Sequence, residues 1–236
     1  GGTHVVVTAG GTREPIDAVR VIANRSSGKQ GYAVAAEALS QGASVTLVST
    51  VVLPTPVGAD LVVVETAAEM QTAVESLAST ADVVVMAAAV ADFRPKLAET
   101  AKLKKDNGVP EIVLEPTPDI LAGLGQRKRP GQILVGFAAE TSDLIANAQA
   151  KLHRKNLDLI VANDVSAPQV GFQHDTNAVT LMRRDGTTTI VALTDKRSVA
   201  RAILECVAEL RSGVSSTGPI RNSSRNPNTS DSGAVQ

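Results

Sequence analysis

Short apolar runs alternate along the chain with segments in which apolar residues recur at helical spacing. The strand-length runs are 4–9, 44–49, 60–65, 82–89, 132–138 and 158–162, and the segments with helical spacing are 27–41, 67–80, 118–128 and 142–156. Runs of the first kind predict buried strands, and the second kind predicts helices. Strands that alternate with helices form a parallel sheet covered on both faces. The sequence therefore predicts an α/β fold with a Rossmann-like, doubly wound, mostly parallel sheet.

The pattern changes near the end of the chain. Two strand-like segments, 178–183 and 187–193, flank Asp185 and Gly186, a dipeptide suited to a tight hairpin turn. A helix is predicted over 195–210, with Asp195 as its N-terminal cap. We expect the hairpin to extend the sheet in the antiparallel direction.

Residues 211–236 have a different composition from the rest. Ser, Gly, Asn, Thr and Pro dominate this segment, and large apolar residues are almost absent. Such a segment cannot bury enough surface to offset the entropy lost on ordering. We therefore expect one domain over 1–210 and a flexible tail over 211–236.

Composition narrows the class of partner. Hydrophobic residues make up 43% of the chain but aromatic residues only 2%, so the core must be built from Val, Ala, Leu and Ile. The 23 basic residues balance 24 acidic ones, which favours a small-molecule partner over nucleic acid or a membrane surface. The apolar runs are shorter than the ~20 residues that span a bilayer, and no signal peptide opens the chain. Cys206 is the single cysteine, which agrees with a reducing compartment, and we expect a cytoplasmic protein.

The loops after the first strand are rich in features that suit anions. Doubly wound sheets bind ligands beyond the carboxyl ends of their strands. Gly10 and Gly11 follow the first strand, and the run from Asn24 to Gly31 leads into a helix whose free N–H groups favour anions. The alternative for Ser26, Ser27 and Gly28 is a plain helix cap and turn.

Two familiar phosphate motifs are absent from these loops. A Walker A loop would need glycine at Ala23 and Ser or Thr at Gln30. A dinucleotide fingerprint would need an acid at the end of the second strand, where the chain has Ser49 and Thr50. These mismatches argue against a Walker ATPase and an ordinary NAD enzyme.

Further candidates follow the later strands. Asp92 follows a run of small residues that would let a base or ribose approach the backbone, and Lys102, Lys104 and Lys105 lie beyond it. The alternative is a turn cap followed by a solvated charged face. Lys151 and Lys155 share a helical face, an arrangement that disfavours folding unless an anion such as a triphosphate, or water, lies between them.

Other kinds of chemistry find no support in the sequence. His4, His153 and His174 have no metal-ligand spacing among themselves or with Cys206, so no metal site held by the protein is expected. No nucleophile elbow or Ser-His-Asp set is present. If the chain is an enzyme, activation by a nucleotide is the expected chemistry.

Taken together in order, the motifs resemble those of the phosphopantothenate-cysteine ligases over residues 5 to 210. The segments that carry the resemblance are 8–17, 24–29, 88–92, 102–105, 136–141, 155–158 and 162–165. The resemblance implies that the carboxylate of 4'-phosphopantothenate attacks the α-phosphorus of CTP, which gives an acyl-cytidylate and pyrophosphate. The amine of L-cysteine then displaces CMP and forms the amide. This chemistry depends on alignment and charge neutralisation more than on a protein nucleophile.

The resemblance also implies roles for individual residues. Asn24 and Lys102 would be catalytic: Asn24 would hydrogen-bond the acyl group, and Lys102 would stabilise charge on the α-phosphate and carbonyl oxygen. The substrate would be held by Arg20, Asn24, Ser26, Ser27, Gly28, Ala88 and Ala89. The nucleotide would be held by Gly10, Gly11, Met86, Ala87, Ala88, Asp92, Lys102, Pro118, Asp119, Ile120, Leu121, Phe137, Lys151 and Lys155. Mg²⁺ would neutralise the triphosphate, bound mainly by phosphate oxygens and water.

Partners and alternatives follow from the same resemblance. It implies a homodimer with part of the site completed across the interface, and an association with a flavin-dependent decarboxylase domain that many bacteria fuse to the ligase. Since the chain begins close to its first strand, we expect an excised domain or a stand-alone ligase without a flavin site. CTP is expected from the bacterial lysine pattern, because family members from animals use ATP. A Rossmann-like oxidoreductase using NAD(P) and a non-catalytic nucleotide-binding module are the competing interpretations.

Overall fold

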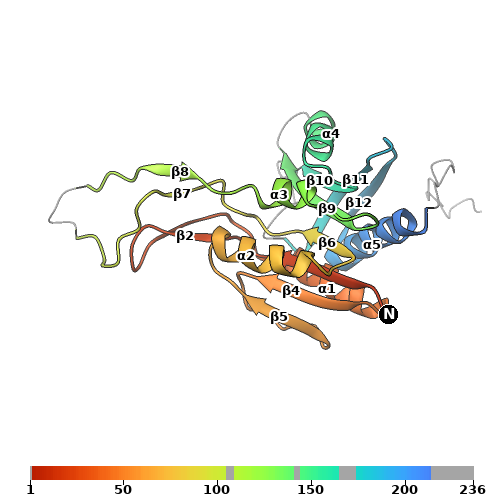
Figure 1. The fold of residues 1–236 in the computed structure, drawn as a ribbon, viewed down its shortest axis with the longest axis horizontal. Coiled ribbons are helices and arrows are strands. Elements are labelled where there is room, and N and C mark those ends of the chain that lie inside the picture. Colours follow the sequence, from red (N-terminus) through yellow and green to blue (C-terminus); the bar gives the residue numbers. More distant parts are fainter. Residues whose placement is uncertain (1, 105–108, 141–143, 165–173, 214–236) are drawn as a thin grey trace, which may run out of the picture.

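A computed structural model describes residues 2–104, 109–140, 144–164 and 174–213 of the chain. Its centre is an eight-stranded sheet in the order β12-β11-β10-β9-β6-β1-β4-β5 (Figure 1). The strands are β1 (His4–Ala9), β4 (Ser44–Ser49), β5 (Ala59–Val63), β6 (Val83–Met86), β9 (Ile133–Glu140), β10 (Leu159–Asp164), β11 (Thr176–Arg183) and β12 (Thr188–Asp195). Six neighbouring strands of the sheet run parallel to one another: β5, β4, β1, β6, β9 and β10. The last two strands, β11 and β12, are added in antiparallel pairings. The predicted fold class is confirmed, including the antiparallel hairpin.

The strand order contains a topological switch point. From β1 the chain proceeds outward through β4 and β5 on one side, and then through β6, β9 and β10 on the other. In register, Val6 of β1 lies opposite Thr46 of β4 and Val84 of β6. Ligands of doubly wound proteins bind where the order reverses, beyond the carboxyl ends of the strands. The boundary between β1 and β6 is therefore the place to look for a site.

Helices cover both faces of the sheet. The helices α1 (Lys29–Ser40) and α5 (Lys196–Ser212) pack on one face, and α2 (Ala67–Ala78), α3 (Ile120–Gln126) and α4 (Leu144–Arg154) pack on the other. Alternate residues of each strand point to opposite faces, so Val5 and Val7 join the first core while Val6 joins the second. Both cores consist mainly of Val, Leu, Ile and Ala, as the composition predicts, and Cys206 lies buried in the first.

Several element boundaries differ from the sequence-based prediction. The strand expected over 82–89 ends at Met86, because the next residues bond sideways to the end of β1: Ala88 N–H to Thr8 Oγ1 and Ala89 N–H to Gly10 O. The helix α3 is shorter than 118–128, and α5 continues two residues past Leu210 before Gly213 ends it in the left-handed conformation. Asp195 caps α5 as predicted, since its Oδ1 accepts hydrogen bonds from Arg197 N and Ser198 N. Most of the predicted tail, from 214 onward, lies outside the described residues.

An arm that the sequence did not predict projects from the sheet (Figure 1). We define the arm as residues 13–23, 93–104 and 109–116. It contains two small antiparallel pairs: β2 (Arg13–Pro15) with β3 (Val21–Ala23), and β7 (Phe93–Pro95) with β8 (Leu114–Pro116). At its base, buried Glu14 accepts a hydrogen bond from Ala67 N at the start of α2, 2.9 Å away. Strands of three residues are too short for a periodic signal, which explains why they were missed.

Within the described ranges, no helix combines the length and the apolar composition required to cross a membrane.

Candidate functional site

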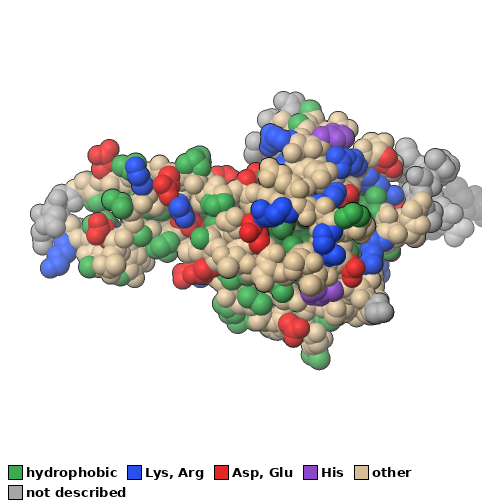
Figure 2. All heavy atoms as spheres, viewed as in Figure 1, with side chains coloured by type: hydrophobic (Ala, Val, Ile, Leu, Met, Phe, Trp, Pro, Cys, Tyr) green, Lys and Arg blue, Asp and Glu red, His purple; other side chains and the backbone are tan. Residues whose placement is uncertain are grey.

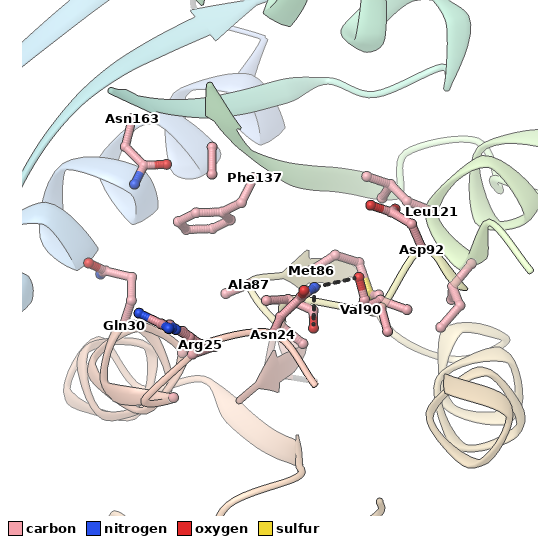
Figure 3. Close-up of a pocket in the computed structure, with 18 of the residues that line it drawn as sticks. Asn24, Arg25, Gln30, Met86, Ala87, Val90, Asp92, Leu121, Phe137 and Asn163 are labelled. Atoms are coloured by element: carbon pink, nitrogen blue, oxygen red, sulfur yellow. Dashed lines mark hydrogen bonds between the residues drawn. The ribbon is translucent and has the colours of Figure 1, made fainter. Parts of the chain in front are cut away.

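A cavity of about 720 Å³ opens at the carboxyl ends of β1 and β6, at the switch point. Figure 3 shows Asn163 and Gln30 at one end, Asp92 and Leu121 at the other, and Phe137 and Asn24 between them. The lining residues are 24–28, 30–31, 86–92, 117–121, Phe137, Ala139, Lys151, Lys155, Asn163, Asn177 and Lys196. Segments far apart in the sequence thus converge on one concave surface.

Most of the sequence-predicted site residues line this cavity. Those that do are Asn24, Ser26, Ser27, Gly28, Met86, Ala87, Ala88, Ala89, Asp92, Pro118, Asp119, Ile120, Leu121, Phe137, Lys151 and Lys155. Gly10, Gly11, Arg20 and Lys102 are not among the lining residues. Gly10 and Gly11 contact the main chain of Ala89, which does line the cavity, and Arg20 and Lys102 lie on the arm. The lining of the cavity therefore includes most of the residues expected to bind the nucleotide, but it does not include Arg20 or Lys102.

Asn24 ties the floor of the cavity together. Its Nδ2 donates hydrogen bonds to Ala89 O at 3.4 Å and to Val90 O at 3.1 Å, shown as dashed lines in Figure 3. The main chain of Gly11 also packs closely against that of Asn24, since a Cβ at position 11 would lie 2.6 Å from Asn24 O. Both amide hydrogens of Asn24 thus point to the main chain. To donate to an acyl carbonyl, one of them must exchange partner.

The helix α1 begins at the cavity without a side-chain cap. Its N-cap residue is Gly28, at φ 76°, which has no side chain to cap the first turn. The left-handed conformation at this position favours glycine. Gly28 thus caps the helix, as the alternative interpretation of this motif held, and Ser26 and Ser27 precede the cap. The N–H groups of the first turn remain suited to an anion.

At one end of the cavity, Lys155 forms an ion pair with Asp119. The Lys155 Nζ lies 2.8 Å from Asp119 Oδ2, and Asp119 Oδ1 also accepts from Ala122 N and so caps α3. Burial raises the pKa of Asp119, but the hydrogen bonds from Lys155 and Ala122 N, together with the charges of Lys155 and Lys151, outweigh burial and leave the pKa below its usual range. Asp92 contributes a second carboxylate to this end.

The opposite end contains polar residues that sequence reasoning missed. Asn163 and Asn177 are 6% and 4% exposed, and Lys196 is 7% exposed. The pKa of Lys196 is lowered, first by burial and then by the nearby charge of Lys29. Gln30 donates to Lys196 O at 3.0 Å, while its buried Oε1 has no partner among the described residues. This end is rich in N–H donors and positive charge.

One of these residues carried a usable signal. Asn163 lies near the carboxyl end of β10, where the doubly wound fold places ligands. Asn177 and Lys196 belong to β11 and α5, outside the parallel strands, and no pattern in the sequence points to them. Among the described residues, no cluster of three or more His, Cys, Asp or Glu side chains could hold a metal ion.

The fold and cavity define a Rossmann-like α/β protein with a cavity at its switch point that is lined by amides and lysines. The profile of the DNA/pantothenate metabolism flavoprotein C-terminal domain matches residues 1–210, and the chain belongs to this family. The resemblance found from the sequence motifs is thereby confirmed.

Known relatives agree with this membership. The chain is 49% identical over 211 residues to the coenzyme A biosynthesis bifunctional protein CoaBC of Bacillus subtilis (strain 168), covering 89% of this chain and 52% of that protein. It is 46% identical over 227 residues to the protein of the same name from Mycobacterium tuberculosis (strain ATCC 25618 / H37Rv), covering 91% and 54%. The chain thus spans about half the length of these relatives. A crystal structure of the C-terminal domain of a CoaBC protein superposes with a TM-score of 0.77 at 41% identity, covering 90% of this chain and 97% of that one.

Proposed function

We propose that the chain joins 4'-phosphopantothenate to L-cysteine at the expense of CTP. The observation that carries the proposal is the convergence of the family's motif residues on one cavity at the switch point, within a chain that belongs to this family. Relatives named for coenzyme A biosynthesis support the same pathway.

The reaction has two steps. A carboxylate oxygen of 4'-phosphopantothenate attacks the α-phosphorus of CTP, the bond to the β-phosphate bridging oxygen breaks, and pyrophosphate leaves. The amine of cysteine then attacks the acyl carbon of the cytidylate, CMP leaves and a proton is released. The cavity supplies amide groups, main-chain N–H groups and lysines, which suits a reaction that depends on alignment and charge neutralisation.

The two ends of the cavity suit different parts of the ligands. The end at 118–121 would take the base and ribose, with Phe137 next to it towards the middle of the cavity and with Lys151 and Lys155 also in the lining. Ser26 to Gly28 would lie near the phosphates, and the donors of Asn163, Asn177 and Lys196 extend that region. Ala88, Ala89 and Asn24 would hold the pantothenate moiety. Mg²⁺, held mainly by phosphate oxygens and water, would neutralise the triphosphate, and Asp92 is a cavity carboxylate able to assist.

A dimer would complete the site. Arg20 and Lys102 belong to the arm and do not line the cavity of their own chain, so a second copy would bring these cations to it. Exposed hydrophobic side chains along the arm, interspersed with charges in Figure 2, suit burial against another protein surface. They are Val19, Val21, Phe93, Leu97, Val109, Ile112, Val113 and Leu114. A decarboxylase domain, fused or associated, would be a further partner.

The test is pyrophosphate release with Mg²⁺, 4'-phosphopantothenate and either CTP or ATP, with and without cysteine. We expect release with CTP that rises when cysteine is added. Release with ATP alone would correct the nucleotide but keep the ligase. CTP binding without any release would favour a non-catalytic nucleotide-binding module, and tight binding of a nicotinamide cofactor instead would favour an oxidoreductase.

A further inference from the structure

Asp17 is a buried carboxylate at the turn between β2 and β3 of the arm. Its side chain is 0% exposed, and every contact it makes is with a donor. Oδ1 accepts from Val19 N at 2.9 Å and from Arg20 N at 2.8 Å. Oδ2 accepts from Arg20 Nε at 2.9 Å, from Arg20 Nη2, and from Leu103 N at 3.1 Å. A carboxylate removed from water needs such donors to remain charged.

The last of these bonds joins the turn to a segment more than 80 positions away. Leu103 donates to Asp17, and its own carbonyl accepts from Arg20 Nη2 at 3.2 Å. Four residues earlier, Glu99 N donates to Ile16 O at 3.0 Å. The segment 99–103 is therefore held against the turn at both of its ends. Lys102, which is exposed, lies within the part that is held.

Two cations with expected roles thus share one anchor. The Arg20 guanidinium holds the pKa of Asp17 well below its usual range, so the carboxylate is ionised at every pH used for assays. Asp17 fixes the Nε and Nη2 side of Arg20, and Arg20 Nη1 has no partner among the described residues. The protein thus fixes the edge of the guanidinium formed by Nε and Nη2, and the Nη1 edge can donate to a ligand.

We propose that Asp17 is a positioning residue, which sets the geometry of Arg20 directly and that of Lys102 through the main chain of Leu103. This inference rests on the proposed ligase function for its effect on catalysis. Transition-state stabilisation requires donors held in place before the reaction, and a lysine on an arm has no surrounding core to hold it. Asp17 performs that task without touching the substrate.

The test compares Asp17→Asn with Glu115→Gln. The first keeps the shape of the side chain but turns its Nδ2 hydrogens toward the Arg20 and Leu103 donors. The second removes the charge of an arm carboxylate that pairs with Arg94 and not with Arg20. We expect Asp17→Asn to lower kcat roughly tenfold or more and to change KM for CTP less, because the donors that Asp17 positions act mainly in the transition state. Glu115→Gln should leave both constants near those of the parent.

A double-mutant cycle separates positioning from general damage. If Asp17 acts only through Arg20 and Lys102, then Asp17→Asn should have no further effect on kcat in a chain that already carries Arg20→Ala and Lys102→Ala. An additional loss of the same size in that background would overturn the proposal. Should Asp17→Asn fail to fold, Leu103→Pro gives a second route, because it deletes the N–H that Asp17 accepts but leaves the Asp17–Arg20 pair intact. Normal turnover in that variant would also count against the proposal.

Amide hydrogen exchange tests the anchor independently of turnover. We expect exchange at Glu99 and Leu103 to be roughly tenfold or more faster in Asp17→Asn than in the parent, and unchanged in Glu115→Gln. A parent chain that released no pyrophosphate would end the ligase proposal, whereas the exchange rates would still decide whether Asp17 holds the segment. Equal exchange rates in parent and Asp17→Asn would overturn the anchor. Faster exchange with an unchanged kcat would overturn its catalytic role.

Discussion

The ammonium group of Lys155 lies 2.8 Å from Asp119 Oδ2 and 2.9 Å from Oδ1, so the two side chains form a bidentate ion pair on the cavity wall. The Lys155 side chain is only 11% exposed, whereas that of Asp119 is 51% exposed, so water reaches the pair from the Asp119 side. The pair also answers a question raised by the sequence. Lys155 shares a helical face with Lys151, and a carboxylate from a different part of the chain supplies a compensating charge.

The ion pair predicts how Lys155→Ala will fail. The substitution removes one positive charge from the cavity and also removes the ion-pair partner of Asp119. The unpaired Asp119 carboxylate would then repel an anionic ligand. We expect KM for CTP to rise about tenfold or more, with a smaller change in kcat. Steady-state rates of pyrophosphate release at varied CTP would measure this. Arg154→Ala is the matched control, because Arg154 is the exposed residue next to Lys155 and does not line the cavity. An equal rise in KM in that variant would mean that only overall charge matters.

The sequence predicted the central sheet well because its strands are buried on both faces and therefore read as continuous apolar runs. Val83 to Met86 is an example, with all four residues buried. The arm escaped prediction because β2, β3, β7 and β8 are three residues each and mostly exposed. Their stability comes from short antiparallel pairings and from single contacts such as that of Glu14 with Ala67 N, which leave no periodic pattern.

The site was predictable to the extent that it lies on strand ends and family motifs. Asp92, Phe137 and Lys155 reach the cavity as expected. The pairing of Lys155 with Asp119 was not predictable, since residues 36 apart meet only through the packing of α3 near the end of α4. Likewise, Lys196 reaches the cavity because α5 folds back beside α1, which is a property of the tertiary structure.

The position of Lys102 on the arm leads to a prediction about subunits. Lys102→Ala and Asn24→Ala should each lower kcat roughly 10²-fold, the scale for loss of a positioned transition-state donor. Lys96→Ala, an exposed lysine on the same arm segment, should have little effect.

If Lys102 acts on the cavity of a second copy, mixing the two inactive variants restores activity. Each mixed dimer then has one site with both residues intact, and about half of the dimers are mixed, so roughly a quarter of the parent activity should return. Sedimentation of the parent should show a dimer. Absence of recovery after subunit exchange, or a fully active monomer, would place the action of Lys102 within its own chain.

Two glycines of α3 form a matched pair for a stability prediction. A Cβ at Gly125 would lie 1.9 Å from Lys155 O, whereas a Cβ at Gly123 would meet only the flexible Arg127 guanidinium at 3.3 Å. We expect Gly125→Ala to lower the free energy of unfolding by about 1–3 kcal/mol and to raise KM for CTP, because α3 must move away from Lys155. Gly123→Ala should be neutral or more stable by up to about 1 kcal/mol, since alanine favours a helix. Urea unfolding would compare the two, and equal stabilities would show that α3 and the end of α4 are not in close contact.

The donor-rich end of the cavity predicts a dependence of CTP binding on pH. Lys196 binds an anion only when protonated, and its lowered pKa means that it loses its proton at a lower pH than an ordinary lysine. Lys29 adds to this lowering, while Asp175 opposes it. CTP affinity of the parent should therefore weaken as the pH rises through the lowered pKa of Lys196. The Lys196→Met variant should bind CTP more weakly than the parent at neutral pH. Its affinity should then show no further loss at alkaline pH. Arg201→Met, on an outward position of the same helix and paired with Glu37, is the control and should keep the parent profile. Calorimetric titration with CTP at several pH values would measure both effects, and an alkaline loss that persists in Lys196→Met would assign the titration to a different group.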